Sequence, residues 1–374
     1  MTDTNKGLIV LAAGGTGGHL FPAQALGEEL VRRGYVVHLM SDERVRDYGS
    51  KFPAADTHVI QSSTILIRKP WTWPGSLMRL WSGYKKARAV FDTVKPLAVI
   101  GFGGYPSLPP LIAAWRAEIP SLVHEQNAVM GRANRLVARK VNKIASSFPK
   151  IVNLDASLND KVVMTGNPVR DLVLKSTGGE YEAPSPRGTF RILVFGGSQG
   201  AQFFSQMMPK VFGELSGVIT KKLSIVQQCR PEDIDGVRAQ YEKLGLKFEL
   251  QAFFSDMPKR IANAHLVIGR SGASTIAELG VIGRPAILVP LPHALDNDQL
   301  RNAESFAGAG AGWVMMQDDI EASALAAFLT RLRYQEDELN NAARAALLQG
   351  HPDAAQKLAD LVEATIHSQN RKTA

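Results

Sequence analysis

The sequence has a single cysteine among its 374 residues, Cys229, and it has no long apolar run. One thiol cannot form an internal disulfide, so we expect a chain that folds without a disulfide framework in a reducing compartment. A helix that spans a bilayer needs about 20 consecutive apolar residues, and no stretch of the sequence approaches that length. We therefore expect a protein that is soluble or bound peripherally to a membrane.

Signatures for metal binding and for nucleic-acid binding are also missing. Asp296 and Asp298 form an isolated D-x-D pair without a supporting cluster of His or Cys, so we predict no metal and no cofactor. The formal net charge of +8 would suit an anionic partner, but none of the RNA- or DNA-binding motifs accompanies it. Nucleic acid is therefore not an expected partner.

What the chain does contain is the same opening pattern twice. Residues 8–13 and residues 190–195 are apolar runs of the kind found in strands buried on both faces of a parallel sheet. A glycine-rich loop and a helical pattern follow each run, at residues 14–19 and 196–201. The predicted fold class is therefore α/β, with two Rossmann-like domains that face each other across a cleft.

A third turn of small residues follows the apolar run 264–268 and opens a further helical pattern. The first N–H groups of a helix have no partner within it, and small side chains would let a phosphate approach them. A carboxylate two turns further along the helix would suit vicinal ribose hydroxyls. The alternative to a ligand site is a capped, buried helix whose glutamate is merely solvated. The residues expected on the ligand-facing side are Ser271, Ser274 or Thr275, and Glu278.

In the first half, residues 98–101 and 121–124 are predicted strands, and each leads into polar or glycine residues. Ligands of parallel sheets gather at the carboxyl ends of the strands, so the side chains that follow these strands should converge. The residues expected there are His19, Gly103, Tyr105, Glu125 and Asn127. His19 directly follows the first glycine loop, and a helix-start histidine that is merely hydrogen-bonded locally is the alternative to a functional one.

A segment rich in tryptophan and basic residues lies between these strands. Three of the five tryptophans fall within residues 71–81. Aromatic rings beside cations are typical of an interfacial contact with anionic lipid, although the segment could instead pack on the protein's own core. The predicted membrane patch consists of Trp71, Trp73, Leu77, Trp81, Lys85 and Lys86, and Trp115 and Arg116 would extend it.

A hydrolase is the rival interpretation of the second glycine loop. The pattern of Gly196, Ser198 and Gly200 formally matches a nucleophile elbow between a strand and a helix, and His265 or His293 could complete a triad. The duplicated half-domain pattern argues against this interpretation.

Six motifs occur in the order and spacing of one family, at residues 14–19, 103–105, 124–127, 166–170, 196–201 and 270–273. Together they resemble the MurG family, the lipid-linked UDP-N-acetylglucosamine transferases of glycosyltransferase family 28. The resemblance runs from the first strand to the last helix, and it implies a GT-B fold. The implied domains are residues 1–168, for the acceptor and the membrane, and residues 169–351, for the UDP-sugar. The last helix, 352–374, would cross back to the first domain.

The resemblance also implies a set of donor-binding residues. Ser198 would hold the diphosphate and Glu278 the ribose, while Phe254 would contact uracil through its backbone, since smaller aliphatic residues occupy its position in the family. Around residues 292–297 the loop is one residue longer than the family pattern, and Asp298 replaces an expected glutamine. The implied set is Thr16, Gly17, Gly18, Asn127, Arg170, Ser198, Phe254, Ala273, Ser274, Thr275, Ile276, Ala277, Glu278 and Gln299.

The implied reaction is the transfer of N-acetylglucosamine from UDP-N-acetylglucosamine to the C4 hydroxyl of lipid I, with inversion, to give lipid II. A single displacement needs a general base, for which His19 is the first candidate and Glu125 the rival. Arg170 and fixed N–H groups would stabilise the leaving diphosphate without a metal. Glu125 and His19 both lie in the predicted first domain.

The implied location is the cytoplasmic side of the bacterial inner membrane, as a peripheral protein, where lipid I is presented. Other cell-wall synthesis proteins are further implied partners. Three alternatives stay open: a glycolipid glycosyltransferase of the same fold, a UDP-N-acetylglucosamine 2-epimerase, and a nucleotide-sugar sensor without catalytic activity.

Overall fold

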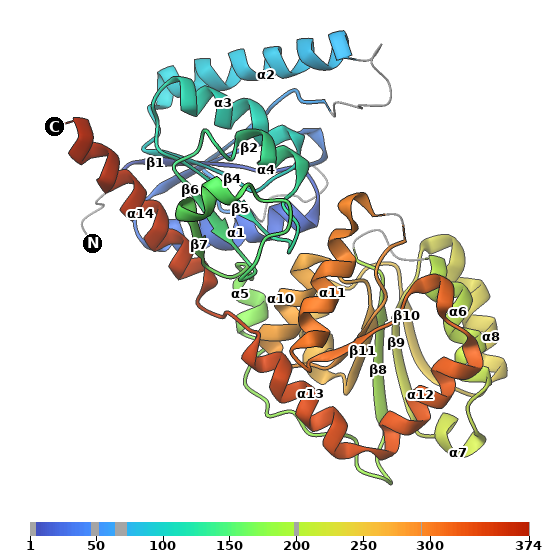
Figure 1. Cartoon of the computed structure of the whole chain (residues 1–374). Helices are drawn as coiled ribbons and strands as arrows, with labels where there is room; N and C mark the ends of the chain where they lie inside the picture. Colours follow the sequence, from blue (N-terminus) through green and yellow to red (C-terminus); the bar gives the residue numbers. More distant parts are fainter. Residues whose placement is uncertain (1–4, 46–51, 64–72, 198–201, 293, 374) are drawn as a thin grey trace. The chain divides into compact units, whose positions relative to one another are not determined.

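The computed structural model describes residues 5–45, 52–63, 73–197, 202–292 and 294–373, and the chain divides into two compact units (Figure 1). The first unit comprises Met1–Arg170 together with His351–Ala374, and the second comprises Asp171–Gly350. The division falls two residues after the predicted boundary at residue 168, and the C-terminal residues group with the first unit.

The first unit is built on a seven-stranded parallel sheet with the order β3-β2-β1-β4-β5-β6-β7. The strands β1 and β4 at its centre are apolar along their whole length because helices cover both faces. Ile9 and Leu11 of the first strand pack into one core, and Val10 and Ala12 pack into the other. The strands are β1 (Leu8–Ala12), β2 (Val36–Ser41), β3 (Asp56–Val59), β4 (Ala98–Gly101), β5 (Ser121–Glu125), β6 (Lys143–Ser146) and β7 (Val162–Met164).

Helices form a layer on each face of this sheet, as Figure 1 shows. Leu26 of one helix and Val362 of the C-terminal helix share a core with one face, whereas Phe91 and Leu111 belong to the core on the other face. The helices of the first layer are α1 (Gly17–Arg32) and α14 (Ala354–Thr373). Those of the second layer are α2 (Trp73–Val94), α3 (Leu108–Arg116) and α4 (Arg132–Val137).

The second unit has a six-stranded parallel sheet with the order β10-β9-β8-β11-β12-β13. Its strands are β8 (Phe190–Phe195), β9 (Leu223–Gln228), β10 (Lys247–Gln251), β11 (Leu266–Gly269), β12 (Ala286–Leu288) and β13 (Gly312–Val314). Its helices are α5 (Asp171–Leu174), α6 (Gln202–Gly213), α7 (Gly217–Thr220), α8 (Ile234–Lys243), α9 (Met257–Asn263), α10 (Ala273–Ile282), α11 (Asp298–Gly308), α12 (Ala322–Tyr334) and α13 (Glu336–Leu348). The α/β class predicted from the sequence is confirmed.

Two segments of strand-like sequence are longer than the strands that form within them. The segment 248–254 continues past the end of β10 at Gln251, where Phe253 is 69% exposed and therefore does not extend the core. The run 283–290 contains only the short strand β12, because prolines at both ends limit the backbone donors available for a ladder. Within the described ranges, no helix combines the length and the apolarity that a bilayer crossing requires.

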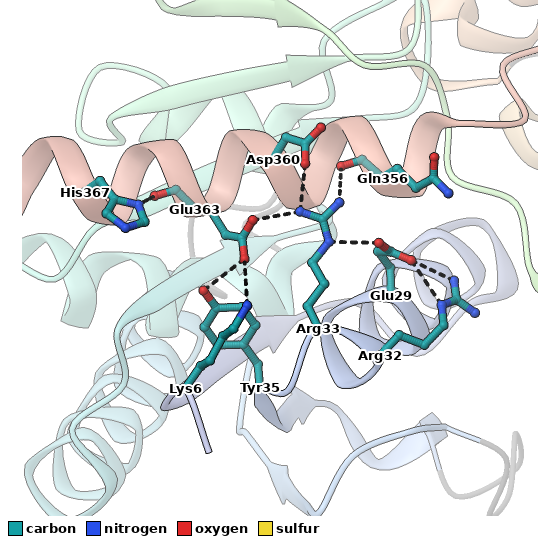
Figure 2. A network of polar contacts seen from close by, with 9 residues as sticks. All are labelled: Lys6, Glu29, Arg32, Arg33, Tyr35, Gln356, Asp360, Glu363 and His367. Atoms are coloured by element: carbon teal, nitrogen blue, oxygen red, sulfur yellow. Dashed lines mark hydrogen bonds and ion pairs between the residues drawn. The ribbon is translucent and has the colours of Figure 1, made fainter. Parts of the chain in front are cut away.

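Arg33, at the end of α1, joins α1 to α14 through charged hydrogen bonds (Figure 2). Its Nη1 donates to Asp360 Oδ1 and to Glu363 Oε2, both at 2.7 Å, and its Nε donates to Glu29 Oε1 at 2.8 Å. The Arg33 side chain is 19% exposed, so solvent screens these pairs only in part. Lys6 and the Tyr35 hydroxyl contact Glu363 as well. This network holds the last helix of the chain on the first unit.

We expect the substitution Arg33→Met to loosen α14. It removes hydrogen bonds to two carboxylates of that helix, a loss of about 1–3 kcal/mol per charged bond, and leaves the acids facing one another. Hydrogen exchange of the α14 amides should become faster. Arg32→Met is the matched control, because Arg32 bonds Glu29 within α1 itself. Equal exchange in the two variants would contradict this role of Arg33.

Candidate functional site

Two glycine-rich loops meet at the carboxyl edge of the first sheet. The Gly14 N–H, after β1, donates to the carbonyl oxygen of Gly103, after β4, at 3.1 Å. Gly103 and Gly104 have φ values of 86° and 74°, which side-chain-bearing residues rarely adopt. A Cβ on Gly104 would lie 3.1 Å from the Gly14 Cα. Glycine is therefore required here by conformation and by space.

His19, in the first turn of α1, lies against this contact. Its Nδ1 is 3.0 Å from the Thr16 hydroxyl oxygen. A Cβ on Gly103 would be 3.3 Å from its Nε2, so the glycine makes room for the ring. Burial, together with the charge of Arg44, lowers the pKa of His19 to about 4, and Asp42 opposes this shift only in part. The imidazole is therefore neutral at pH 7 and keeps one nitrogen lone pair.

The start of α1 is open to a ligand. Thr16 is the N-cap residue, with an extended backbone and no capping hydrogen bond from its side chain. Gly18 is exposed, and beyond its own helix and chain neighbours no described atom lies within 4 Å of the position that a Cβ would take. A helix N-terminus with this accessibility favours an anion, and the binding role of Thr16, Gly17 and Gly18 stays a prediction.

Glu125, at the end of β5, is engaged in supporting a loop. Its side chain is 1% exposed, and its carboxylate accepts hydrogen bonds from the Asn127 N–H at 3.1 Å and the Gly131 N–H at 2.8 Å. The Asn134 Nδ2 donates a third, at 2.8 Å. Burial raises the pKa of Glu125, and these donors partly counteract the rise. The carboxylate therefore fixes the loop that carries Asn127 and the start of α4.

His124 ties the same strand to the segment that leads out of the first unit. Its Nε2 is 3.0 Å from the Gly166 carbonyl oxygen, which can only accept, so Nε2 carries the proton. Its Nδ1 then accepts from Gln126 Nε2 at 3.1 Å. Burial lowers the pKa of His124 to about 4. The neutral ring thereby anchors residues 166–170 beside β5.

That segment carries one predicted residue and one that the sequence analysis did not select. The Arg170 guanidinium lies 3.8 Å from the centre of the Phe21 ring of α1. Asn167 is 5% exposed, and within the described residues neither Oδ1 nor Nδ2 has a hydrogen-bond partner. Leaving a buried amide unpaired costs about 1–3 kcal/mol per group. The sequence feature that could have identified Asn167 as a site residue is its place in the motif at 166–170. Only the structure shows that its amide is unpaired.

In the second unit, a backbone turn joins β11 to α10. Gly272 is the N-cap, in an extended conformation and without a side-chain cap. Ser271 is fully buried; its hydroxyl donates to the Gln299 carbonyl oxygen at 2.7 Å, and Asn302 Nδ2 donates to the Ser271 carbonyl oxygen at 3.1 Å. Ser271 therefore joins the starts of α10 and α11 instead of facing a ligand, which corrects its predicted role.

The other predicted residues of α10 follow the N-terminus of the helix. Ser274 and Glu278 are four residues apart and share a face, and the Ser274 hydroxyl has no partner among the described residues. Glu278 is 8% exposed. The Gln299 Oε1 accepts from the Leu291 N–H at 3.0 Å, which leaves Nε2 as the end of the amide that can meet a ligand. Ala273 and Ile276 are buried, and Thr275 and Ala277 are partly buried.

Arg270 was not predicted as a site residue. It is 7% exposed and donates to three neutral acceptors: the carbonyl oxygens of Val289 and Pro290, both at 3.1 Å, and Gln317 Oε1 at 2.6 Å. Burial lowers the pKa of Arg270, but a guanidinium stays charged at neutral pH. The residue therefore places a buried positive charge beside the start of α10.

Phe254 and the second glycine loop complete the predicted donor residues. The Phe254 ring is 3% exposed and is covered by the Arg260 guanidinium at 4.1 Å, so its side chain is not available to a ligand. Ser198 lies outside the described residues, as do Trp71 and His293.

His265 does not fit the catalytic triad of the hydrolase interpretation. This residue comes directly before β11, and its Nδ1 accepts from the Arg191 N–H at the amino end of β8. Gly196 and Gly197, the described start of the second glycine loop, follow the carboxyl end of the same strand. The length of β8 therefore separates His265 from the start of that loop.

An exposed apolar and basic surface lies on α2. Leu77, Met78 and Trp81 are 56%, 72% and 57% exposed, and Trp73 is 40% exposed. Lys85 Nζ is 5.5 Å from the centre of the Trp81 ring. The opposite side of α2, with Ala87 and Phe91, packs on the sheet, so the alternative that Trp73 and Trp81 belong to the core is wrong. On neighbouring α3, Trp115 is 41% exposed beside Lys140 and Arg116.

The family of the chain follows from two sequence models. The glycosyltransferase family 28 N-terminal domain matches residues 9–146, and the family 28 C-terminal domain matches residues 191–358. The chain therefore belongs to glycosyltransferase family 28.

Individual relatives cover nearly the whole chain. A protein of Sinorhizobium fredii is 51% identical over 361 residues, which is 96% of this chain and 96% of the relative. It is named UDP-N-acetylglucosamine–N-acetylmuramyl-(pentapeptide) pyrophosphoryl-undecaprenol N-acetylglucosamine transferase. A protein of Chelativorans sp. with the same name is 50% identical over 356 residues, 95% of this chain and 94% of the relative.

Solved structures show the same architecture. Acinetobacter baumannii MurG superposes with a TM-score of 0.77 and 28% identity over 96% of this chain and 99% of that one. A putative UDP-N-acetylglucosamine 2-epimerase of Listeria monocytogenes superposes with a TM-score of 0.69 over 98% of both chains, but at 13% identity this likeness concerns the fold alone. The predicted GT-B fold is thus confirmed.

Proposed function

We propose that this family 28 glycosyltransferase moves N-acetylglucosamine from UDP-N-acetylglucosamine to the C4 hydroxyl of the muramyl residue of lipid I, which forms lipid II with inversion. The observation that carries the proposal is the identity of about half of all residues, over nearly the full chain, with proteins named for this transfer. The similar fold of an epimerase does not support the epimerase alternative, because that protein is only 13% identical to this chain.

His19 acts as the general base in this proposal. As the acceptor oxygen attacks C1 of the sugar, its proton passes to the imidazole, and the bond from C1 to the UDP oxygen breaks. The low pKa of His19 keeps the base unprotonated at neutral pH, and an approaching diphosphate would raise this pKa toward a value better suited to proton transfer. Glu125 is the weaker candidate, because three N–H donors already occupy its carboxylate.

Positive groups in each unit suit the charge that develops on the departing UDP. In the first unit these are Arg170 and the open N-terminus of α1. In the second unit they are the N-terminus of α10 and the buried charge of Arg270. Such fixed donors stabilise a leaving diphosphate without reorganising, so the proposal assigns no step to a metal. Ser274, Glu278, Gln299 and the unpaired amide of Asn167 would bind polar groups of the substrates.

We also infer that the exposed surface of α2 binds the cytoplasmic face of the inner membrane, where the chain would meet lipid I as a peripheral protein. Support comes from Trp73, Leu77, Met78 and Trp81, which are exposed in a row that α2 presents away from the sheet. Lys85 lies beside them and would meet anionic headgroups. Contacts with other cell-wall synthesis proteins belong to the same proposal.

The direct test of the function follows labelled N-acetylglucosamine from UDP-N-acetylglucosamine to a water-soluble lipid I analogue, in EDTA. We expect label in the acceptor, and release of UDP that depends on the acceptor. A reaction without acceptor serves as the control. Formation of N-acetylmannosamine in that control, with no transfer to the analogue, would favour an epimerase and overturn the proposal.

For the base, we expect His19→Ala to lower transfer by about 10² to 10⁴-fold while UDP binding persists, because loss of a general base affects the proton transfer and not the nucleotide contacts. Glu125→Gln is the contrasting variant. It replaces an acceptor of three hydrogen bonds with an amide, so its main effect should be a lower melting temperature. Wild-type turnover in His19→Ala would remove His19 from the role.

For the membrane surface, we expect Trp81→Ala to weaken binding to vesicles that contain anionic lipid by about 10- to 100-fold, since a buried large apolar side chain contributes roughly 1.5–3 kcal/mol. Transfer to a water-soluble acceptor should be unchanged. Leu348→Ala is the control, because Leu348 is 82% exposed in the second unit. An equal loss in both variants would contradict a specific surface on α2.

A further inference from the structure

Two histidines and an aspartate meet at the outer strands of the first sheet. In the parallel pair β2 and β3, His38 is in register with Asp56, and Met40 is in register with His58. Residues at alternate positions share a face, so His38, Asp56 and His58 lie on one side of the sheet. This is the side on which Met40 packs with Ala87 and Phe91 of α2.

The ligating atoms of the three side chains are close together. His38 Nδ1 is 3.1 Å from His58 Nε2, and Asp56 Oδ2 is 3.6 Å from the same nitrogen. One ligating atom from each of the three residues lies within 4.8 Å of the other two. Tetrahedral zinc holds imidazole nitrogens at about 2.0–2.1 Å, which separates two of them by about 3.3 Å. The side chains are therefore already close to the separation that one shared ion imposes.

We propose that His38, Asp56 and His58 form a binding site for a divalent transition metal such as Zn²⁺. Two imidazoles and a carboxylate suit zinc, nickel or copper, whereas magnesium and calcium prefer all-oxygen ligands. Three protein ligands leave one tetrahedral position for water or a further ligand. The site joins the edge strand β3 to β2 and lies apart from the carboxyl edge of the sheet, because His38 is level with Val10 in the middle of β1.

Solvent can reach one of the three proposed ligands. Asp56 has a side chain that is 57% exposed, which gives an ion access from solvent. Lys86 is an unfavourable charge near His58, and its exposed position on α2 lets the ammonium turn into solvent.

A neutral His–His hydrogen bond, with Asp56 beside it, is the competing explanation of the same distances. The two explanations differ in what the isolated protein does with added metal. A ligand set binds one ion tightly and is stabilised by it, whereas a hydrogen-bonded pair gains nothing from the ion.

The test uses the full chain, stripped of metal with EDTA and dialysed, and titrated with Co²⁺ by absorption and with Zn²⁺ by calorimetry. We expect one tetrahedral Co²⁺ spectrum per chain and a rise in melting temperature with Zn²⁺. His38→Gln and His58→Gln should each weaken binding by about 100-fold or more, because each removes a direct ligand, a larger loss than the 10- to 100-fold for outer-shell partners. His367→Gln, on α14, should leave it unchanged.

The result that overturns the proposal is a chain that binds no Co²⁺ saturably, or binds it equally well in His38→Gln and His58→Gln. Circular dichroism of each variant establishes that it is folded. Sugar transfer should continue in the metal-free protein and in both variants, because the cluster lies apart from the carboxyl edge of the sheet, where the glycine loops contact His19. If the chain binds no metal at this cluster, the proposed transferase activity is therefore unaffected. If the chain transfers no sugar, the metal titration still tests the metal site.

Discussion

The candidate site of the first unit depends on one backbone hydrogen bond, from the Gly14 N–H to the Gly103 carbonyl oxygen. It brings the loops after β1 and β4 into contact, and only glycine fits at Gly104, where a Cβ would lie 3.1 Å from Gly14. The imidazole of His19 rests against the same loops and is partly buried there. Burial is the largest cause that lowers the pKa of His19, so the backbone geometry influences the chemistry of the side chain.

Buried polar groups divide into those that the fold satisfies and those that it does not. Glu125 and His124 have complete sets of hydrogen-bond partners, and each fixes a segment that carries other site residues. Within the described residues, the amide of Asn167 and the hydroxyl of Ser274 have none. A fold that leaves such groups unpaired loses stability, and a bound polar ligand can recover it. In the proposed function, Glu125 and His124 belong to the scaffold of the site, and Asn167 and Ser274 would bind the substrates.

The sequence predicted the central strands well because β1 and β4 are buried on both faces and have continuous apolar sequences, and β5 and β8 have apolar centres. Edge strand β3, with the sequence Asp-Thr-His-Val, has no such run and was missed.

The role of Glu125 could not be predicted, since its donors come from a loop and from α4. The pairing of His38 with Asp56 depends on strand register, which a sequence does not display. His265 remained a triad candidate of the rival hydrolase interpretation until the structure was known, because a pattern does not say which end of a sheet a residue occupies.

The most direct test of the account is the titration of His19 by NMR of ¹⁵N-labelled histidine, with the His19→Asn variant used to assign the signal. The account predicts that the ring stays neutral as the pH falls and becomes protonated only near pH 4, because its burial between the glycine loops opposes the charge. Protonation with a midpoint near 6.5, the value of a solvated histidine, would show that the ring is exposed to water and would contradict the proposed geometry of the base.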